Sequence, residues 1–468
     1  MDTITYLNLT VNGFPFQKVT SFMIRHDPNQ HAIASVTGEV EPDMAQDSLQ
    51  RTDENTQIEI CTTAEGQPSI IFRGCVSDTS LKQDNAYSYV TLTLKSVSRL
   101  TDITKRNKTY QNTAATYGQI ISGNISDVAD LHMMVSDKAI GSLVMQYGET
   151  DWEFAKRMAS KLNAPLITNL SSARAQLYIG LPPASRTVSE TSLFFDYASD
   201  TSQYAENQGA MAQDFAGETV QSYAYAYLGD AITFNGKTSR IKSVRAEMKD
   251  GILQMQYGLL GGNASTGGGS SLSGIAVPQT ANTQASGKMM KGRVEEVQGD
   301  KVKVFLTSVD QEYDSGGNWW FPYSTTYSSS DGSGWYCMPE QGDEVLVFFP
   351  SGNEGEAFAA SSVCASPPSN PRNKSWKAPG GKEILLTDEG MYIIGKHGKI
   401  FINLTDKDGI EIHSDKDINI SSEAKVSITA SKEVNIIAAN QVVIGTEDAY
   451  MEITENTATL AASQVLIN

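Results

Sequence analysis

The feature that most constrains this chain is an eight-residue repeat of apolar pairs near its C-terminus. The first members of the pairs are Ile402, Ile410, Ile418, Val426, Val434 and Val442, and the second members are Leu404, Ile412, Ile420, Ile428, Ile436 and Ile444. A spacing of two residues places both side chains of a pair on one face of a strand. Because a period of eight does not follow the 3.6-residue turn of a helix, each repeat is predicted to be a short strand followed by a bend.

A single repeat cannot bury its two apolar residues, so the repeats must stack on one another. Eight residues at about 3.3 Å each are too short to encircle a core, so about three repeats are needed for each turn. Either one chain supplies all three, as a single-chain β-helix, or three chains supply one each. Residues 376–468 hold about 11 or 12 repeats, or about four turns of a single-chain coil. Three intertwined chains would form a needle on the order of 50 Å long, and the period alone leaves both arrangements open.

The period changes after Val442 and Ile444, where polar Tyr450 and Glu452 occupy the next expected positions. The apolar residues that follow are Met451, Ile453, Leu460, Val465 and Ile467. We therefore expect a regular shaft from Ile402 to Ile444 and a modified tip after it.

Composition excludes several classes of protein. The chain has 468 residues, with 36 basic and 54 acidic side chains and a net charge of -18, which argues against nucleic acid or an anionic lipid surface as a partner. No apolar run is long enough to span a membrane. Residues 1–10 lack a basic region, so no signal peptide is expected and the protein is predicted to be synthesised in the cytoplasm.

The cysteines and histidines do not predict a metal or cofactor site. Cys61, Cys75, Cys337 and Cys364 have no metal-binding spacing, and the five histidines are scattered. Cys61 and Cys75 lie on neighbouring strand-like segments, so the sequence leaves open whether they pair. Reduced, packed thiols are favoured for a protein made in the cytosol.

The order of segments divides the chain into six parts. Residues 1–100 read as short strands typical of a barrel, 101–170 contain helices, and 171–260 return to strands. Residues 261–286 are rich in Gly and Ser and predict a flexible or extended linker. Residues 287–366 form a compact unit of five strands, and 376–468 carry the repeat.

A dense motif lies in the helical part. Its residues are Gln146, Tyr147, Glu149, Thr150, Asp151, Trp152, Phe154 and Arg157, followed by Met158 and Ala159. The motif resembles the QY-x-ETDW-x-F-x-x-RLA signature of phage late control protein D and VgrG proteins, the hub and spike of contractile injection machines. Met158 in place of Leu is the main departure. Read without the family, the same residues cap and pack one helix, with Thr150 or Asp151 at its start.

The resemblance implies a mainly β fold with two hub barrels, at 1–100 and 171–260, on either side of a helical segment. It also implies an OB-fold at 287–366, where Pro339–Phe348 carries the closest similarity, and an intertwined triple-stranded β-helix at 376–468. Three chains with two similar barrels each would form a pseudo-sixfold ring. Because the whole order of domains agrees with the family, it favours three chains over one for the needle.

The function implied is that of a homotrimeric hub and spike without catalytic activity. Its partners would be a hexameric tail tube protein, other baseplate proteins and a PAAR-type tip protein or effector, with a bacterial envelope as target. The protein would be assembled into a tail or virion-like particle and ejected toward that envelope. Whether the machine is a phage, a bacteriocin or a secretion system stays open.

Two other functions compete with this one. The first is an OB-fold module that binds carbohydrate or nucleic acid through Trp319, Trp320 and Trp335. The second is a polysaccharide-degrading enzyme on a single-chain β-helix. The absence of a spare module or a known catalytic motif argues against an enzyme.

Overall fold

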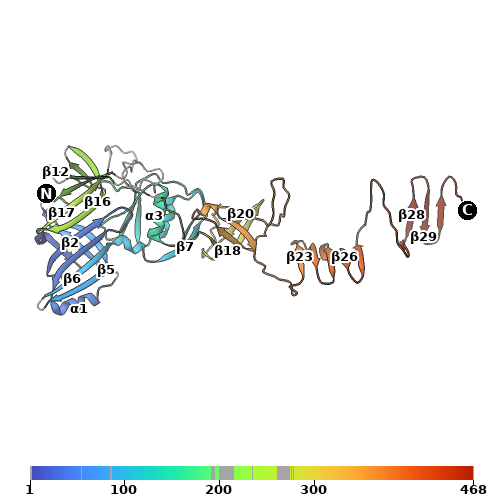
Figure 1. Cartoon of the computed structure of the whole chain (residues 1–468), viewed down its shortest axis with the longest axis horizontal. Helices are drawn as coiled ribbons and strands as arrows, with labels where there is room; N and C mark the ends of the chain where they lie inside the picture. Colours follow the sequence, from blue (N-terminus) through green and yellow to red (C-terminus); the bar gives the residue numbers. More distant parts are fainter. Residues whose placement is uncertain are drawn as a thin grey trace. The chain divides into compact units, whose positions relative to one another are not determined.

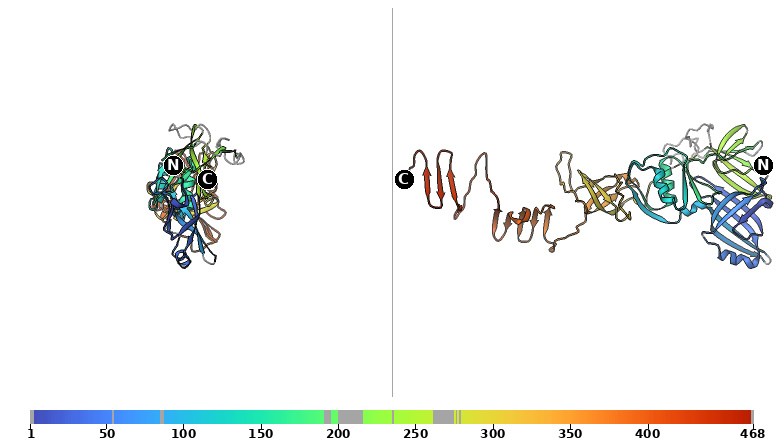
Figure 2. Two further views of the ribbon diagram at one scale, coloured as in Figure 1. Left: turned by 90° about the vertical axis from the view of Figure 1, so that its left-hand side faces the viewer. Right: turned by 180° about the vertical axis from the view of Figure 1, so that it is seen from behind.

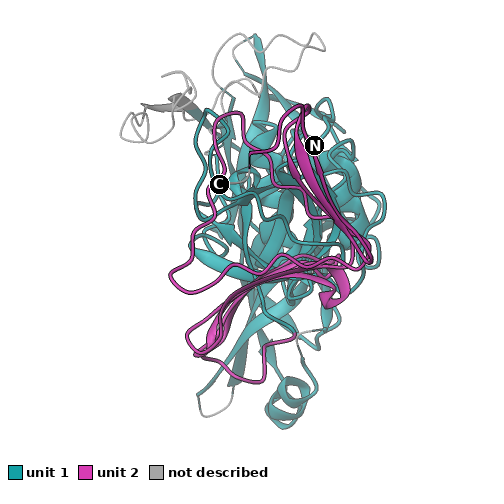
Figure 3. Ribbon diagram, turned by 90° about the vertical axis from the view of Figure 1, so that its right-hand side faces the viewer, with its two compact units in different colours: residues 1–365 teal, residues 366–468 magenta. Residues whose placement is uncertain are grey.

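The computed structural model describes residues 3–53, 55–84, 87–190, 195–199, 216–234, 236–260, 275, 277 and 279–466. The chain divides into two compact units, unit 1 (residues 1–365) and unit 2 (residues 366–468), which are described separately below (Figure 3). In both units the described regular structure is mainly β-strand, as predicted. None of the helices that the structure describes is long and apolar enough to cross a membrane.

The largest element of unit 1 is a sheet of twelve described strands (Figure 1). Its first half comprises β1 (Leu9–Asn12), β2 (Lys18–His26), β3 (Ile33–Val40), β4 (Gln57–Thr62), β5 (Ser69–Asp84) and β6 (Tyr87–Ser96). Its second half comprises β12 (Thr187–Glu190), β13 (Phe195–Ser199), β14 (Ala216–Ser222), β15 (Ala231–Phe234), β16 (Lys237–Lys249) and β17 (Ile252–Leu259). The main path runs β1-β4-β5-β6-β3-β2-β16-β17-β14-β13, and a short helix, α1 (Pro42–Gln50), follows β3.

The two barrels predicted as separate domains are joined in this sheet. Strand β2 pairs with β16 antiparallel, with Ile24 opposite Ala246 and His26 opposite Val244. Alternating residues face inward along β3 and β6, and one core contains side chains from both halves, including Phe22 and Tyr257. The alternation predicts each strand but does not specify the pairing of β2 with a strand about 200 residues away. That pairing makes one shared core from two predicted ones.

The segment 101–170 is richer in strands than the sequence predicts. It holds α2 (Tyr117–Ile125), α3 (Asp151–Lys161), β7 (Lys105–Tyr110), β8 (Ala129–Met133), β9 (Val144–Thr150) and β10 (Leu166–Thr168). With β11 (Ala175–Ile179), it forms the three-stranded sheet β10-β11-β8 and the β7-β9 pair. These elements enclose their own apolar core and are called the motif module below.

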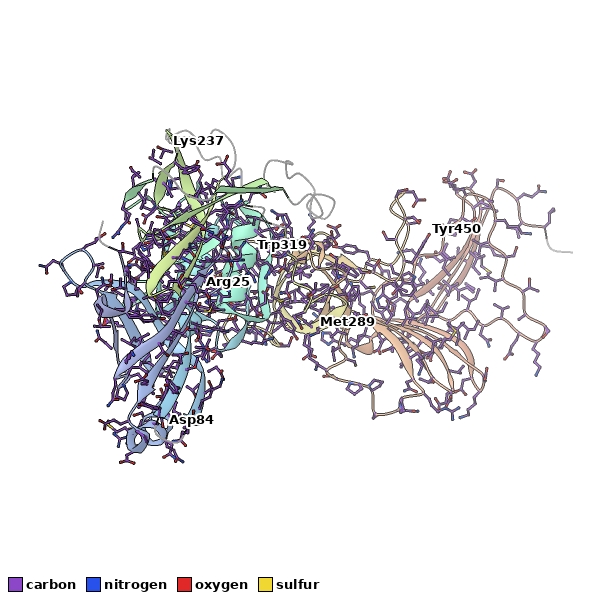
Figure 4. All side chains as sticks on the ribbon, turned by 60° about the vertical axis from the view of Figure 1, so that its left-hand side comes forward. Arg25, Asp84, Lys237, Met289, Trp319 and Tyr450 are labelled. Carbon is purple, nitrogen blue, oxygen red and sulfur yellow. The ribbon has the colours of Figure 1, made fainter. Side chains whose placement is uncertain are left out.

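A closed barrel of five strands follows, which confirms the predicted compact β unit. Its strands are β18 (Lys288–Gln298), β19 (Lys301–Phe305), β20 (Phe321–Ser324), β21 (Glu344–Phe349) and β22 (Phe358–Ser362). The barrel closes in the order β18-β19-β20-β22-β21 around Val294, Val304, Phe321 and Phe349. Met289 and Trp319 mark its position in Figure 4.

The predicted linker is only partly independent of its surroundings. Residues 261–274 lie outside the described part of the chain. Further on, the Gln279 side chain donates to Asn163 Oδ1 at 2.8 Å, and buried Asn282 donates to the Met145 carbonyl at 3.1 Å. The end of the segment therefore packs against the motif module, because polar side chains there find partners that composition does not reveal.

Unit 2 consists of two antiparallel meanders (Figures 1 and 2). The first contains β23 (Lys374–Lys377), β24 (Glu383–Leu386), β25 (Gly390–Ile394), β26 (Ile400–Thr405) and β27 (Gly409–Ser414), and the second contains β28 (Gln441–Gly445), β29 (Tyr450–Thr454) and β30 (Ala458–Ala461). Within the described residues, no strand lies between β27 and β28. The antiparallel pairings differ from the parallel rungs of a single-chain β-helix, and one chain does not form the predicted β-helix by itself.

The join between the two halves of the large sheet predicts a specific pH dependence. His26 is buried, and neither ring nitrogen has a hydrogen-bond partner among the residues that the structure describes. Burial lowers the pKa of His26 to about 4, although the negative charge of Asp27 acts to raise it. A lowered histidine pKa means that the unfolded chain binds a proton first. Stability is therefore full above about pH 6.5 and falls as the pH drops toward 4, by about 3 kcal/mol from this group.

We expect His26→Leu to flatten this dependence. The measurement is the midpoint of urea unfolding, detected by tryptophan fluorescence, at pH 7 and pH 4.5 in the wild-type protein and the variant. An equal loss of stability on acidification in the variant would assign the effect to other groups.

Candidate functional site

The motif residues lie at a sharp passage from strand β9 into helix α3. Gly148 lies at an irregularity in the β7-β9 pairing, where the register shifts by one residue. Its φ of +63° is a left-handed backbone conformation that favours glycine. Thr150 then caps the helix: its hydroxyl accepts from Glu153 N at 3.1 Å, and Thr150 N donates to Glu153 Oε2 at 2.9 Å. This reciprocal capping box starts the helix where the sequence predicts.

Gln146 connects three elements of the motif module. It is fully buried, and its amide nitrogen donates to Asp151 Oδ1 at 3.0 Å and to the Glu149 carbonyl at 3.1 Å. Its amide oxygen accepts from Asn124 of α2 at 2.7 Å. Burial raises the pKa of Asp151, and the hydrogen bond from Gln146 opposes that shift. Gln146 therefore satisfies a buried carboxylate while it holds β9, α2 and α3 together.

Arg157 lies at the centre of a buried ionic cluster. Its guanidinium donates to both Glu149 oxygens, at 2.7 and 2.8 Å, to Glu354 Oε1 at 2.8 Å and to the Met145 carbonyl at 2.7 Å. Burial raises the pKa of Glu149, although Arg157 opposes the shift. Burial by itself lowers the pKa of Arg157, but the two carboxylates outweigh it and the net pKa is raised. One cation thus serves two carboxylates away from water.

This cluster joins the motif module to the five-stranded barrel. Glu354 belongs to the short 3-10 helix Glu354–Glu356, which lies between β21 and β22 of the barrel. A second contact joins the same parts, because half-buried Asp310 accepts from the Thr109 backbone N at 2.6 Å and from the Thr109 hydroxyl. Burial raises the pKa of Asp310, and both Thr109 hydrogen bonds lower it. No sequence pattern points to Glu354 or Asp310, because these residues lie 197 and 201 positions from their partners Arg157 and Thr109.

The aromatic motif residues contact three different surroundings. The centres of the Trp152 and His31 rings are 4.0 Å apart. His31 lies between strands β2 and β3 of the large sheet. Phe154 stacks on Tyr110 inside the module with ring centres 5.5 Å apart. Tyr147 lies under the Lys288 ammonium of the barrel, 4.6 Å from the ring centre. The motif therefore holds the sheet, the module and the barrel in one body, and Figure 4 shows how densely side chains fill this region.

A Ser-His-Asp arrangement lies beside the motif. His31 Nδ1 is 2.8 Å from Ser98 Oγ, and His31 Nε2 is 3.2 Å from Asp102 Oδ2. Burial raises the pKa of Asp102, but hydrogen bonds from His31 and Thr150 outweigh it and the net pKa is lowered. Ser98 is fully buried and also bonds to Ser96, so a substrate cannot reach its hydroxyl. The arrangement instead ties the large sheet to the cap of α3.

The apolar residues of the first meander line up in two columns on one face of the sheet. The first column is Trp376, Ile384, Ile393, Ile402 and Ile412, and the second is Leu386, Met391, Leu404 and Ile410. Directly opposed residues of antiparallel strands share a face. Ile410 and Ile412 are 72% and 61% exposed, so this face is uncovered in the single chain.

The second meander continues the same pattern. Its columns are Val442, Ile453 and Ala458, and Ile444, Met451 and Leu460. The sequence pattern predicts a modified tip after Ile444, but in the structure the apolar columns continue there. A hairpin reverses the chain direction after β28, so Met451 pairs with Ile444 and Ile453 pairs with Val442. These columns, together with the exposed apolar pairs of residues 418–436 between the two meanders, are called the octad face below. Ile467 lies outside the described residues.

The other candidate residues do not assemble into a site. Trp320 lies under Lys303 at 5.0 Å, Trp319 packs edge-on to Phe321, and Trp335 is 54% exposed. Cys61 and Cys75 are buried free thiols opposite Ile70 and Gln57, and burial raises the pKa of both thiols. Within the described ranges, His, Cys, Asp and Glu side chains form no group of three that could hold a metal ion.

Comparison with known proteins identifies the five-stranded barrel. Residues 290–363 match the family model of the type VI secretion system/phage-baseplate injector OB domain. No curated protein matches the sequence.

Two solved structures share the fold over most of the chain. One is the E. coli c3393 protein, described as a type VI secretion component that is structurally similar to the T4 bacteriophage tail proteins gp27 and gp5. It is 15% identical, with 76% of this chain and 99% of that chain covered and a TM-score of 0.54. The other belongs to the half-lidded PdpA-VgrG complex of Francisella. It is 9% identical, with 87% of this chain and 88% of that chain covered and a TM-score of 0.53.

These findings place the injector OB domain of the phage-baseplate and type VI secretion type at residues 290–363. Over most of its length the chain shares the fold of VgrG-like and phage-tail proteins, in agreement with the resemblance predicted from residues 146–159. At these identities the likeness of the solved structures is one of fold.

The ionic cluster predicts a large effect of Arg157→Met. Removing the cation leaves Glu149 and Glu354 buried and close together, which costs about 3–5 kcal/mol of unfolding free energy. The matched control is Arg51→Met, since Arg51 pairs with Asp47 at 2.7 Å on the exposed helix α1 and contributes about 0–1 kcal/mol. Both free energies are measured by urea denaturation of the full chain. Equal, small losses in the two variants would contradict the role assigned to Arg157.

Proposed function

We propose that this protein is the homotrimeric hub and spike of a contractile, phage-tail-like injection apparatus. In this proposal, unit 1 forms the hub that caps the tail tube, and unit 2 forms the needle that punctures the envelope. The observation that carries the proposal is the uncovered octad face. Ten of the twelve predicted core residues are exposed in the single chain, with Ile420 at 75% and Ile428 at 73%, and Ile402 and Val442 are half-buried.

The exposed octad face favours association over a monomer. Burying one Ile or Val side chain contributes about 1.5–3 kcal/mol, and the two columns offer many such side chains in register. A soluble monomer with a continuous apolar face would be prone to nonspecific association. Three copies that turn their octad faces inward would bury the columns around one axis and leave the polar residues of each repeat in water.

The construction of unit 1 fits a part that bears load. The motif module and the OB barrel are joined by the buried ion pair of Arg157 with Glu354 and by the partly buried hydrogen bonds of Thr109 to Asp310, and Trp152 contacts His31 beside the large sheet. Force on the hub would reach the barrel through these contacts without a flexible joint between them. The work is supplied by contraction of the apparatus, so the proposed role requires no catalytic residue.

The same proposal includes the partners expected from the family. They are a hexameric tail tube protein, other baseplate proteins and a PAAR-type tip protein or effector, with a bacterial envelope as target. The assembly would be built in the cytoplasm and ejected toward that envelope. The competing carbohydrate-binding role is less favoured, because Trp319 and Trp320 are each engaged in separate contacts within the barrel.

The mass in solution tests the trimer directly. We expect light scattering at micromolar concentration to give three times the 50.7 kDa of one chain. The association would be driven by burial of apolar surface and not by surface ion pairs, which salt screens. The mass should therefore stay the same at high salt. A mass of one chain across that range would overturn the proposal.

Ile428→Asp tests the assignment of the core. The change places three carboxylates at one level of a dry axis, and burying even one unpaired charge costs several kcal/mol. We expect trimer assembly to fail in light scattering. Ser427→Asp is the matched control, because the neighbouring residue points to the opposite face and its variant should assemble normally. A heat-stable trimer of Ile428→Asp would contradict the core assignment.

A further inference from the structure

Strand β7 of the motif module pairs with β9 along one edge and, within the described chain, with no strand along the other (Figure 1). Every residue from 103 to 108 is exposed, whereas Thr109 is buried. Ile103, just before the strand, is a large apolar residue with 55% of its surface exposed. This part of β7 contributes no side chain to the core of the module and is held mainly by its pairing with β9.

The OB barrel already occupies one half of the outer edge of β7. Thr109 N donates to Asp310 Oδ1 at 2.6 Å, and the Thr109 hydroxyl donates to the other oxygen of the same carboxylate. Two residues further on, the Gln111 carbonyl accepts from Asn318 N at 3.0 Å and from Trp319 N at 3.1 Å. Where the barrel reaches this edge, the edge therefore binds both a carboxylate and backbone groups.

The other half of the outer edge, at Lys105 and Asn107, is called the open edge below. In an antiparallel pair the backbone groups of alternate residues point to the same side. The extra residue of the pairing, Gly148, lies on β9, so the alternation along β7 is unbroken. The backbone groups of Lys105 and Asn107 therefore point outward like those of Thr109, and no described residue forms a hydrogen bond with them there.

The open edge is basic, although the protein as a whole is acidic. The exposed stretch contains Lys105, Arg106 and Lys108 and no acidic side chain, in a chain whose net charge is -18. Arg106 and Lys108 lie on one face of the strand and Lys105 on the other, so cations flank the outward backbone groups on both faces. Arg106 pairs with Asp151 through Nε at 3.3 Å, and its side chain is still 45% exposed.

We propose that the open edge of β7 binds an extended acidic segment of a partner protein by strand addition. The segment continues the row of contacts that Asp310 begins: its backbone pairs with Lys105 and Asn107, and its carboxylates lie beside the cations. In this mode of recognition main-chain hydrogen bonds provide affinity, and side chains on either face provide specificity. The exposed Ile103 offers an apolar contact at one end. This inference adds a partner to the proposed function and does not depend on the trimer.

The charges favour an acidic protein segment over other occupants. Lysines on an exposed edge prevent nonspecific strand pairing by repelling basic edges, and they attract acidic ones. A second copy is disfavoured, because β7 against β7 would place like charges opposite each other and a threefold assembly does not join identical patches. A nucleic acid is repelled by the net charge of the chain and finds no aromatic ring among residues 103–108 to stack on.

Peptide binding to the full chain tests the proposal. The probe is a short fluorescein-labelled peptide of alternating glutamate and threonine, and binding is measured by fluorescence anisotropy. We expect saturable binding of this peptide and no binding of the matching peptide of lysine and threonine. An acidic peptide with N-methylated backbone amides keeps the charge but cannot donate main-chain hydrogen bonds, so it should not bind. Hydrogen exchange measured by mass spectrometry should slow in the segment that contains Lys105 and Asn107.

Two double variants locate the site. Lys105→Gln with Lys108→Gln removes two cations from the exposed stretch and should weaken binding about tenfold. The matched control is Lys18→Gln with Lys301→Gln, which removes the same charge from exposed strand positions in β2 and β19. The control should change the affinity by less than about twofold. Urea unfolding of both variants checks that each is folded.

Each contrary result has a distinct meaning. Absence of peptide binding, or an equal loss of affinity in both double variants, would overturn the inference. Equal binding of the N-methylated peptide would overturn strand addition, and tighter binding of oligo(dT) than of the acidic peptide would overturn the choice of partner. Light scattering of the same samples separates the two proposals: a trimer that binds no acidic peptide overturns this inference alone, and a monomer that binds it overturns the proposed function alone.

Discussion

The buried contact of Arg157 with Glu149 and Glu354 is the interaction on which unit 1 depends. Removing a guanidinium from water costs several kcal/mol of free energy. A buried arginine is therefore stable only when carboxylates and carbonyls bind its N–H groups. Glu149 comes from the end of the motif strand, and Glu354 comes from the OB barrel. The cluster is satisfied only when the barrel sits in one position on the motif module. The need to neutralise Arg157 therefore fixes the position of the barrel on the motif module.

The other motif residues support that joint. Gln146 holds the strand, α2 and α3 together through the backbone and through Asp151, while Thr150 fixes where α3 begins. Trp152 and His31 connect the same helix to the large sheet. The motif is thus a structural signature in which each side chain meets a different neighbour. This explains how about a dozen residues can carry a family resemblance through capping and packing alone.

Unit 2 follows the opposite design. Its octad face is largely exposed, and residues 415–440 make no backbone-backbone hydrogen bond to any other described residue. The proposed trimer would cover this face. The sequence pattern predicted two apolar residues per strand, and the columns of the first meander contain them as expected. It did not predict hairpins, because a period of eight fits either a return to the same sheet or a turn to another face. The same ambiguity made the shift to Met451 and Ile453 look like the end of the repeat, whereas the hairpin after β28 restores the columns.

What the sequence determined by itself was local: the strand-and-bend unit of eight residues, the cap at Thr150, the compact five-stranded unit and the family resemblance of the motif. These depend on residues within a few positions of one another. The tertiary structure decided that β2 pairs with β16, that Arg157 meets Glu354 and that Thr109 meets Asp310. By sequence pattern alone, many other alternating strands could pair with β2, and many other carboxylates could pair with Arg157 or Thr109. Only the packing of whole elements, which brings residues about 200 positions apart into one core, selects among them.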